Sequence, residues 1–203
     1  MVVLKRRFLI GALALCGAAA LARAESASPI TTLDDALARA FPRARIERRT
    51  LALSAADVAA VEKRAHARCE ARLVTAYVAW RGDTLAGAAY TDRRVVRTRE
   101  AMLMISVAPD TTVARIDVLA FFEPPDFRPP ARWLERFRGA KPGPSLAPGR
   151  DIPPLAGASL TSRAVTESAR LALAWHALLL APQLTTAHPG RSSASVEHVE
   201  SPR

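Results

Sequence analysis

A short segment rich in small and hydroxyl-bearing residues, directly before a helical pattern, is the part of this sequence best suited to chemistry. Residues 156–162 read Ala-Gly-Ala-Ser-Leu-Thr-Ser, and a helix is expected from about Arg163. Gly157 permits a bend that a side chain would hinder, and the free N–H groups of a first helical turn favour a negatively charged group. The sequence therefore predicts a phosphate-binding site beside the hydroxyls of Ser159, Thr161 and Ser162.

The same residues have a simpler interpretation. Ser and Thr are favoured at helix N-termini for capping alone. Taken by itself, the pattern of residues 156–162 favours an ordinary N-cap loop. The choice between a cap and a binding site therefore depends on the rest of the chain.

The N-terminus has the pattern of a secretory signal peptide. Basic residues 5–7 precede the apolar run 8–21, and Ala22-Arg23-Ala24 places small residues where a signal peptidase cleaves. The apolar run is too short for a stable membrane-spanning helix, so cleavage after Ala24 is favoured over a retained anchor. We expect residues 1–24 to be removed and the protein to be exported, with a periplasmic location.

Removal of the signal peptide leaves a chain of single-domain size with a basic surface. Residues 25–182 are long enough to bury a core, whereas residues 183–203 are polar and aperiodic and are predicted to be a disordered tail. Loss of four basic residues with the signal peptide lowers the formal charge from +10 to +6. The remaining arginines are scattered with few aromatics between them, which argues against a nucleic-acid partner. They indicate a solvated basic surface or attraction to an anionic partner or membrane.

Cysteine and histidine give no indication of a metal or disulfide. After cleavage Cys69 is the remaining cysteine, so no intrachain disulfide is expected. The four histidines lack ligand spacing with thiols or carboxylates, and no metal site is predicted.

Hydrophobic periodicity and turn residues predict the order of helices and strands. Helices are expected at 32–41, at 55–66 with Ser54 as N-cap, and from Arg163 to about Leu180. The last helix is strongly apolar, so it is expected to be buried, and Pro182 is expected to end it. Strands are expected at 73–80, 84–90, 101–107 and 113–122. This order predicts an α+β domain with an antiparallel β meander flanked by helices.

Residues 156–162 and the helix after them resemble the attachment motif of the FMN-binding domain found in the G subunit of Rnf complexes and the C subunit of sodium-pumping NADH:quinone reductases. In that family the motif reads Ser/Thr-Gly-Ala-Thr/Ser-x-Thr/Ser-Ser, and its fourth residue carries FMN through a phosphodiester. The resemblance implies that Ser159 is the acceptor, with Thr161 as the second choice. It also implies that Gly157, Ala158, Leu160 and the end of the helix expected at Arg163 frame the phosphate, and that Thr161 and Ser162 are hydrogen-bond partners of the phosphate.

The resemblance extends over residues 30–182 and includes two further stretches. Residues 123–128 fall where the family has Glu-Thr-Pro-Gly-x-Gly, a loop that borders the flavin, so Glu123 is a candidate flavin contact. A proline-stiffened strand exit explains the same residues. Residues 133–141 resemble the family's short helix with its Gln-Phe-x-Gly-Lys ending, which makes Lys141 either a partner of the FMN phosphate or a solvated lysine.

The resemblance implies an exported flavoprotein with covalent FMN, matured by a separate flavin transferase, that relays electrons between soluble or membrane-associated redox partner proteins. An electron-transfer flavoprotein is expected more than a stand-alone enzyme. Two alternatives stay open. Ala156 replaces a Ser or Thr of the motif and Pro153 replaces an upstream Asp, which favours a degenerate domain without flavin that serves as an exported interaction or scaffold module. The other alternative is the flavin-bearing subunit of a multi-chain reductase.

Overall fold

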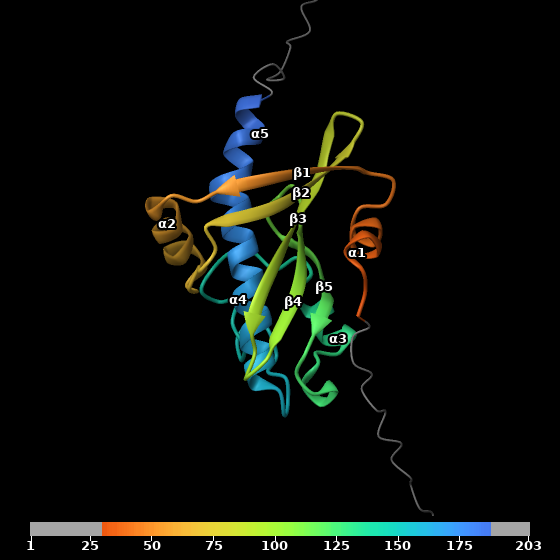
Figure 1. The fold of residues 1–203 in the computed structure, drawn as a ribbon, viewed down its shortest axis with the longest axis vertical. Helices are drawn as coiled ribbons and strands as arrows, with labels where there is room; N and C mark the ends of the chain where they lie inside the picture. The colour runs from red at the N-terminus through yellow and green to blue at the C-terminus, as the bar shows by residue number, and fades with distance from the viewer. Residues whose placement is uncertain (1–29, 188–203) are drawn as a thin grey trace, which may run out of the picture.

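Five strands form one antiparallel sheet in which each strand pairs with its neighbour in the sequence (Figure 1). The computed structural model describes residues 30–187, and the strand order across the sheet is β1-β2-β3-β4-β5. The strand bounds are Arg45–Ala52, Leu73–Arg81, Thr84–Val95, Glu100–Val107 and Val113–Phe121. The predicted α+β meander is confirmed. The predicted signal peptide, residues 1–24, lies outside the described residues.

The first strand, β1, was not predicted from the sequence. It pairs with β2 from Arg45 opposite Trp80 to Ala52 opposite Leu73, and it forms an edge of the sheet. Its residues lack the apolar alternation that marks a strand with one fully buried face, because arginine and glutamate hold most of its central positions. Charged side chains on an edge strand discourage pairing with a further chain. The charged residues that made β1 hard to predict are therefore suited to its position at the edge of the sheet.

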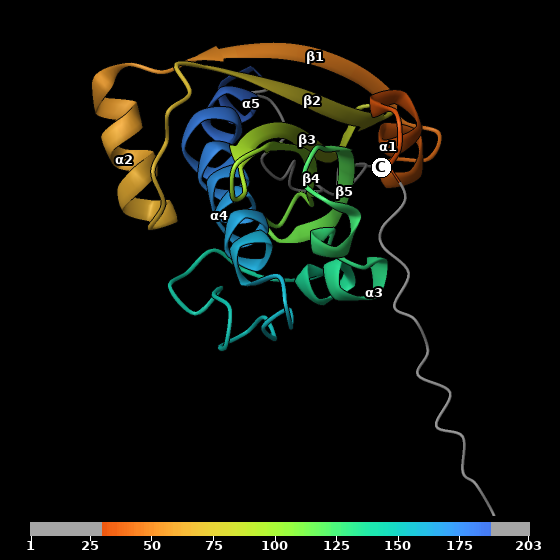
Figure 2. The ribbon, with the colours of Figure 1, turned by 60° about the horizontal axis from the view of Figure 1, so that its bottom comes forward.

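Helices cover both faces of the sheet (Figure 2). They are α1 (Leu33–Ala40), α2 (Ala55–Ala65), α3 (Ala131–Leu134), α4 (Ser159–Trp175) and α5 (Ala181–Ala187), with the short helices η1 (Pro125–Phe127), η2 (Glu135–Phe137) and η3 (His176–Leu180). On one face, α4 packs against β3 and β4, and α2 packs against α4. On the other face, α1 packs against β4 and β5. Along β2, Val78 belongs to the core on the α4 side and Ala79 to the core under α1, as the alternation of a strand requires.

The first two helices begin at capping residues. Thr32 accepts a hydrogen bond from the N–H of Asp35 at the start of α1. Ser54 and Asp57 form a reciprocal capping box at the start of α2, which confirms the predicted N-cap. These caps fix where the chain enters each helix.

Helix α4 begins at Ser159, four residues before the predicted start. The prediction was wrong because it placed the hydroxyl-rich segment in a loop before the helix, whereas residues 159–162 form the helix's first turn. Towards the other end, Ala174, Trp175 and the following His176 are buried, as expected for a strongly apolar helix. The candidate acceptor is therefore a helical residue.

Pro182 does not end the helical segment, which corrects a second expectation. The wide π turn η3 carries a backbone hydrogen bond from the N–H of Ala181 to the oxygen of His176, five residues earlier. Such a turn lets the helix adjust next to a proline. Pro182, the second residue of α5, follows this turn, so the helical segment continues through the proline. Helix α5 continues to Ala187, so the start of the predicted tail, 183–187, is helical, and residues 188–203 lie outside the described residues.

The chain between β5 and α4 contains the short helices η1, α3 and η2 and a long turn-rich loop. Two buried side chains, Leu146 and Ile152, hold this loop against the core. Within residues 30–187, no helix has the length and apolar character needed to cross a membrane.

Candidate functional site

The hydroxyl-rich segment forms a sharp entry into α4. Gly157 has φ +74°, in the left-handed region that glycine adopts without strain, and Ala158 is the N-cap residue. Because alanine has no side-chain oxygen, no side chain of Ala158 caps the N–H groups of the first turn. Ser159 follows as the first helical residue, and its side chain is exposed. An exposed hydroxyl thus lies at the positive end of a helix of 17 residues.

Thr161 has a different environment from Ser159. Its side chain is 1% exposed, and its hydroxyl donates a hydrogen bond of 2.8 Å to the backbone oxygen of Phe127. This bond ties the first turn of α4 to η1. Thr161 therefore has a structural partner and is a poor acceptor for a bulky group.

Ser162 is also buried, and its hydroxyl has no hydrogen-bond partner among the described residues. It is absent from the lining of the surface hollows around the motif. The structure therefore gives no support for a phosphate contact at Ser162.

Two adjoining hollows lie at the start of α4. The one beside Ser159 has a volume of about 270 Å³ and is lined by Gly157, Ala158, Ser159, Leu160, Thr161, Arg97 and Phe127. The other has a volume of about 500 Å³ and is lined by residues 97–99 of the β3–β4 turn and by Phe122, Glu123, Pro124, Pro125 and Phe127. Arg97 and Phe127 line both hollows. The hydroxyl-rich segment and the segment around Glu123, predicted separately, thus lie next to each other.

Glu123 has a structural role in this arrangement. Its Oε1 accepts hydrogen bonds from the N–H groups of Arg97, Thr98 and Arg99, at 2.9, 2.7 and 2.8 Å. The bonds from Arg99 and Thr98 do most to hold the pKa of the Glu123 carboxyl below its ordinary value. The side chain is 5% exposed. Glu123 therefore borders the larger hollow while its carboxylate fixes the β3–β4 turn.

Arg97 is the site residue that sequence reasoning missed. Its guanidinium lies over the ring of Phe127, 4.3 Å from the ring centre. The side chain is exposed, and no carboxylate among residues 30–187 forms an ion pair with it. The only signal in the sequence was a basic turn between two predicted strands, which is also typical of a solvated hairpin. Its distance along the chain from residues 156–162 concealed the contact.

Lys141 lies away from this site. Its neighbours in space include Asp110, in the turn between β4 and β5. The pKa of Asp110 is lowered mainly by the hydrogen bond from the Thr112 hydroxyl and to a smaller extent by the charge of Lys141. The preceding residue, Ala140, accepts a hydrogen bond from the N–H of Val113 at the start of β5. Glu123 follows the other end of that strand, roughly 26 Å away at the usual rise per residue. The cation expected from the sequence near the phosphate is therefore not Lys141.

Trp133 positions the loop that leads into the motif. It is buried, its ring packs edge-on against Phe137 with ring centres 5.2 Å apart, and its indole N–H donates to the oxygen of Pro153 at 2.8 Å. Trp133 is thus a core residue and does not line either hollow.

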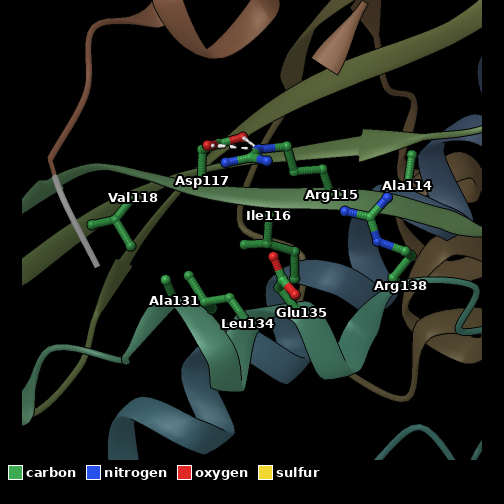
Figure 3. Close-up of a pocket in the computed structure, with 9 residues that line it drawn as sticks. All are labelled: Ala114, Arg115, Ile116, Asp117, Val118, Ala131, Leu134, Glu135 and Arg138. Carbon is green, nitrogen blue, oxygen red and sulfur yellow. Dashed lines mark hydrogen bonds and ion pairs between the residues drawn. The ribbon is translucent and has the colours of Figure 1, made fainter. Parts of the chain in front are cut away.

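A separate cavity between β5 and the α3–η2 segment is too small for a flavin. It measures about 50 Å³, and Figure 3 shows its polar residues, including Arg115, Asp117 and Glu135. Asp117 accepts two hydrogen bonds from the Arg115 Nε, at 2.9 and 2.8 Å, and it also lies 3.4 Å from Arg39. These ion pairs therefore satisfy Asp117 internally.

The residues around the two hollows have the chemistry that FMN needs. An exposed hydroxyl at Ser159 and the Arg97 guanidinium, which stacks on Phe127 and forms no direct ion pair among the described residues, suit a phosphate. The neighbouring hollow is lined on one side by aromatic and proline side chains, including Phe122, which is 61% exposed, and on the other side by the polar turn 97–99 and Glu123. Its size and its aromatic side chains suit a planar ring system. Residues 30–187 hold no cluster of three side chains suited to a metal ion.

Comparisons of this chain with protein-family models, with curated proteins and with solved structures found no match.

Proposed function

We propose that this protein is an exported flavoprotein that carries FMN covalently on Ser159 and relays electrons between redox partner proteins. The observation that carries the proposal is the position of Ser159. Its side chain is exposed in the first turn of α4 and lines one of two adjoining hollows. Burial of the Thr161 hydroxyl supports Ser159 as the acceptor over Thr161.

Attachment needs an activated phosphate, such as the pyrophosphate of a flavin dinucleotide. Ser159 Oγ would attack the phosphorus on the FMN side, so that an Oγ–P bond forms and the pyrophosphate P–O bond breaks. AMP leaves, the serine proton is released, and no electrons are transferred. A flavin transferase would supply the general base that takes up this proton.

Electron relay is the function that a tethered flavin suits best. The flavin supplies one- and two-electron chemistry, while the protein holds it in place and sets its surroundings. The hollows lie at the surface, beside the exposed side chains of Phe122 and Leu160. A redox partner can therefore approach the site directly, and export would place that partner outside the cytoplasm.

A matched pair of serine variants tests the assignment of the acceptor. Ser159→Ala should abolish covalent flavin when the protein is produced with a flavin transferase. Ser162→Ala makes the same chemical change three residues along the helix and should keep full attachment, because the Ser162 hydroxyl has no hydrogen-bond partner to lose. Intact mass, followed by mass mapping of the modified peptide, reads out both variants. Attachment that persists in Ser159→Ala would exclude Ser159 as the acceptor.

A further inference from the structure

We propose that Arg97 is the residue that binds the phosphate of the tethered FMN and holds it against the start of α4. This inference rests on the proposed function, since it names the cation of the same site. Among the arginines that the structure describes, Arg97 alone lines both the hollow of Ser159 and the hollow of Phe122. Arg97 therefore lies between the hollow of Ser159, where we place the phosphate, and the hollow of Phe122, where we place the flavin ring.

The backbone of Arg97 is held in position independently of any ligand. The carboxylate of Glu123 accepts the N–H groups of all three turn residues, 97–99, and so prevents the turn from opening. A side chain on a fixed backbone loses less freedom when it binds than one on a mobile loop.

The side chain of Arg97 is also supported by the motif itself. Its guanidinium stacks on Phe127, and the oxygen of Phe127 accepts the hydroxyl of Thr161. Arg97 and the first turn of α4 are therefore held by one residue of η1. A stacked guanidinium keeps its N–H groups at the edge of the plane, where they can donate to phosphate oxygens.

The neighbouring arginines are engaged elsewhere. Arg94 bridges Asp92 and Glu167, at 2.8 and 3.0 Å. Arg163, four residues after Ser159, pairs with Glu167 at 2.9 Å and lines neither hollow. Arg97 forms no direct ion pair with a carboxylate among the described residues, and its acidic neighbour, Glu123, uses its Oε1 for the backbone N–H groups of residues 97–99. The guanidinium N–H groups of Arg97 are therefore available to an anion.

The first experiment compares rates of FMN attachment by a purified flavin transferase with a flavin dinucleotide, measured by intact mass. Arg97→Gln should slow attachment about tenfold or more, the loss expected for one charged hydrogen bond. Arg97→Lys keeps the charge and should recover part of the rate. Arg163→Gln removes one charge close to Ser159 and should react at the wild-type rate. Thermal unfolding confirms that each variant is folded.

The second experiment detects the contact directly. After prolonged reaction, the phosphorus-31 resonance of the tethered phosphodiester should move in Arg97→Gln and stay at the wild-type position in Arg163→Gln. A wild-type attachment rate together with an unmoved resonance in Arg97→Gln would overturn the role of Arg97 while leaving the flavoprotein proposal intact. An equal loss of rate in Arg97→Gln and Arg163→Gln would overturn it as well. A wild-type protein that accepts no flavin would instead reject the proposed function.

Discussion

Ser159 and Thr161 lie in the same helical turn, yet their hydroxyls have different surroundings. The side chain of Ser159 is exposed at a hollow, whereas Thr161 is buried and bonded to the oxygen of Phe127. The sequence pattern presents both hydroxyls as acceptors, because it does not show which side of the turn faces the protein. The difference in burial makes Ser159 the accessible hydroxyl. The bond from Thr161 to Phe127 instead positions the first turn of α4 against η1.

Removal of the Thr161 hydroxyl should loosen the start of α4. Thr161→Val keeps the shape of the side chain and leaves the oxygen of Phe127 without its donor, which should cost about 1 kcal/mol of unfolding free energy. Thr161→Ser keeps the hydroxyl and serves as the control. Denaturant unfolding of the two variants measures the difference. Equal stability of Thr161→Val and the wild type would contradict the role of this bond.

A buried histidine should make the stability of the fold depend on pH. His176 is 1% exposed, and its Nδ1 lies 3.1 Å from the hydroxyl of Tyr90 in a hydrogen bond. Burial lowers the pKa of His176 from 6.5 to about 4. At pH values between about 4 and 6.5, His176 is protonated in the unfolded chain but neutral in the folded protein. Stability should therefore fall as the pH falls from 6.5 to 4, by roughly 3 kcal/mol in total.

Unfolding curves across this pH range check the expectation. The double variant His176→Leu with Tyr90→Phe removes both partners of the bond, so its stability should change less steeply between pH 6.5 and 4. An identical pH dependence in the wild type and the double variant would show that other groups are responsible.

At the level of elements, the sequence predicted the parts whose local pattern agrees with their burial. The strands from β2 to β5 carry enough apolar residues to be recognised, and Ser54 marks the start of α2. Strand β1 was missed because an edge strand rich in arginine has no clear apolar period. The continuation past Pro182 was missed because the π turn that permits it has no sequence signal.

One glycine shows how closely α1 approaches the sheet. Gly87 in β3 has φ +140°, and an added Cβ would lie 2.5 Å from the oxygen of Val107 and 2.9 Å from the ring of Phe41. Gly87→Ala should therefore lower the unfolding free energy by about 1–3 kcal/mol or more, through strain and overpacking. Gly82, at φ +57° with open space around it, provides the control, because Gly82→Ala introduces backbone strain without a clash. Thermal unfolding should rank Gly87→Ala well below Gly82→Ala, and the reverse order would contradict this packing.

At the scale of the whole molecule, the candidate site is assembled from three distant segments. The β3–β4 turn, the exit of β5 and the start of α4 meet at one end of the sheet. The sequence indicated the start of α4 through its glycine and hydroxyl residues and the exit of β5 through the family resemblance, but it did not indicate the β3–β4 turn. Lys141, closer to residues 156–162 along the chain, lies by the opposite end of β5, whereas Arg97 reaches the site. Only the pairing of β3 with β4 brings Arg97 there, and that pairing is a property of the complete sheet.

The most direct test is the intact mass and visible spectrum of the exported wild-type protein, produced together with a flavin transferase. We expect a mass increase of one FMN less one water, with yellow absorbance that survives denaturation and is lost in Ser159→Ala. An unmodified mass with no flavin absorbance would contradict this expectation and would favour a domain that keeps the fold without the cofactor.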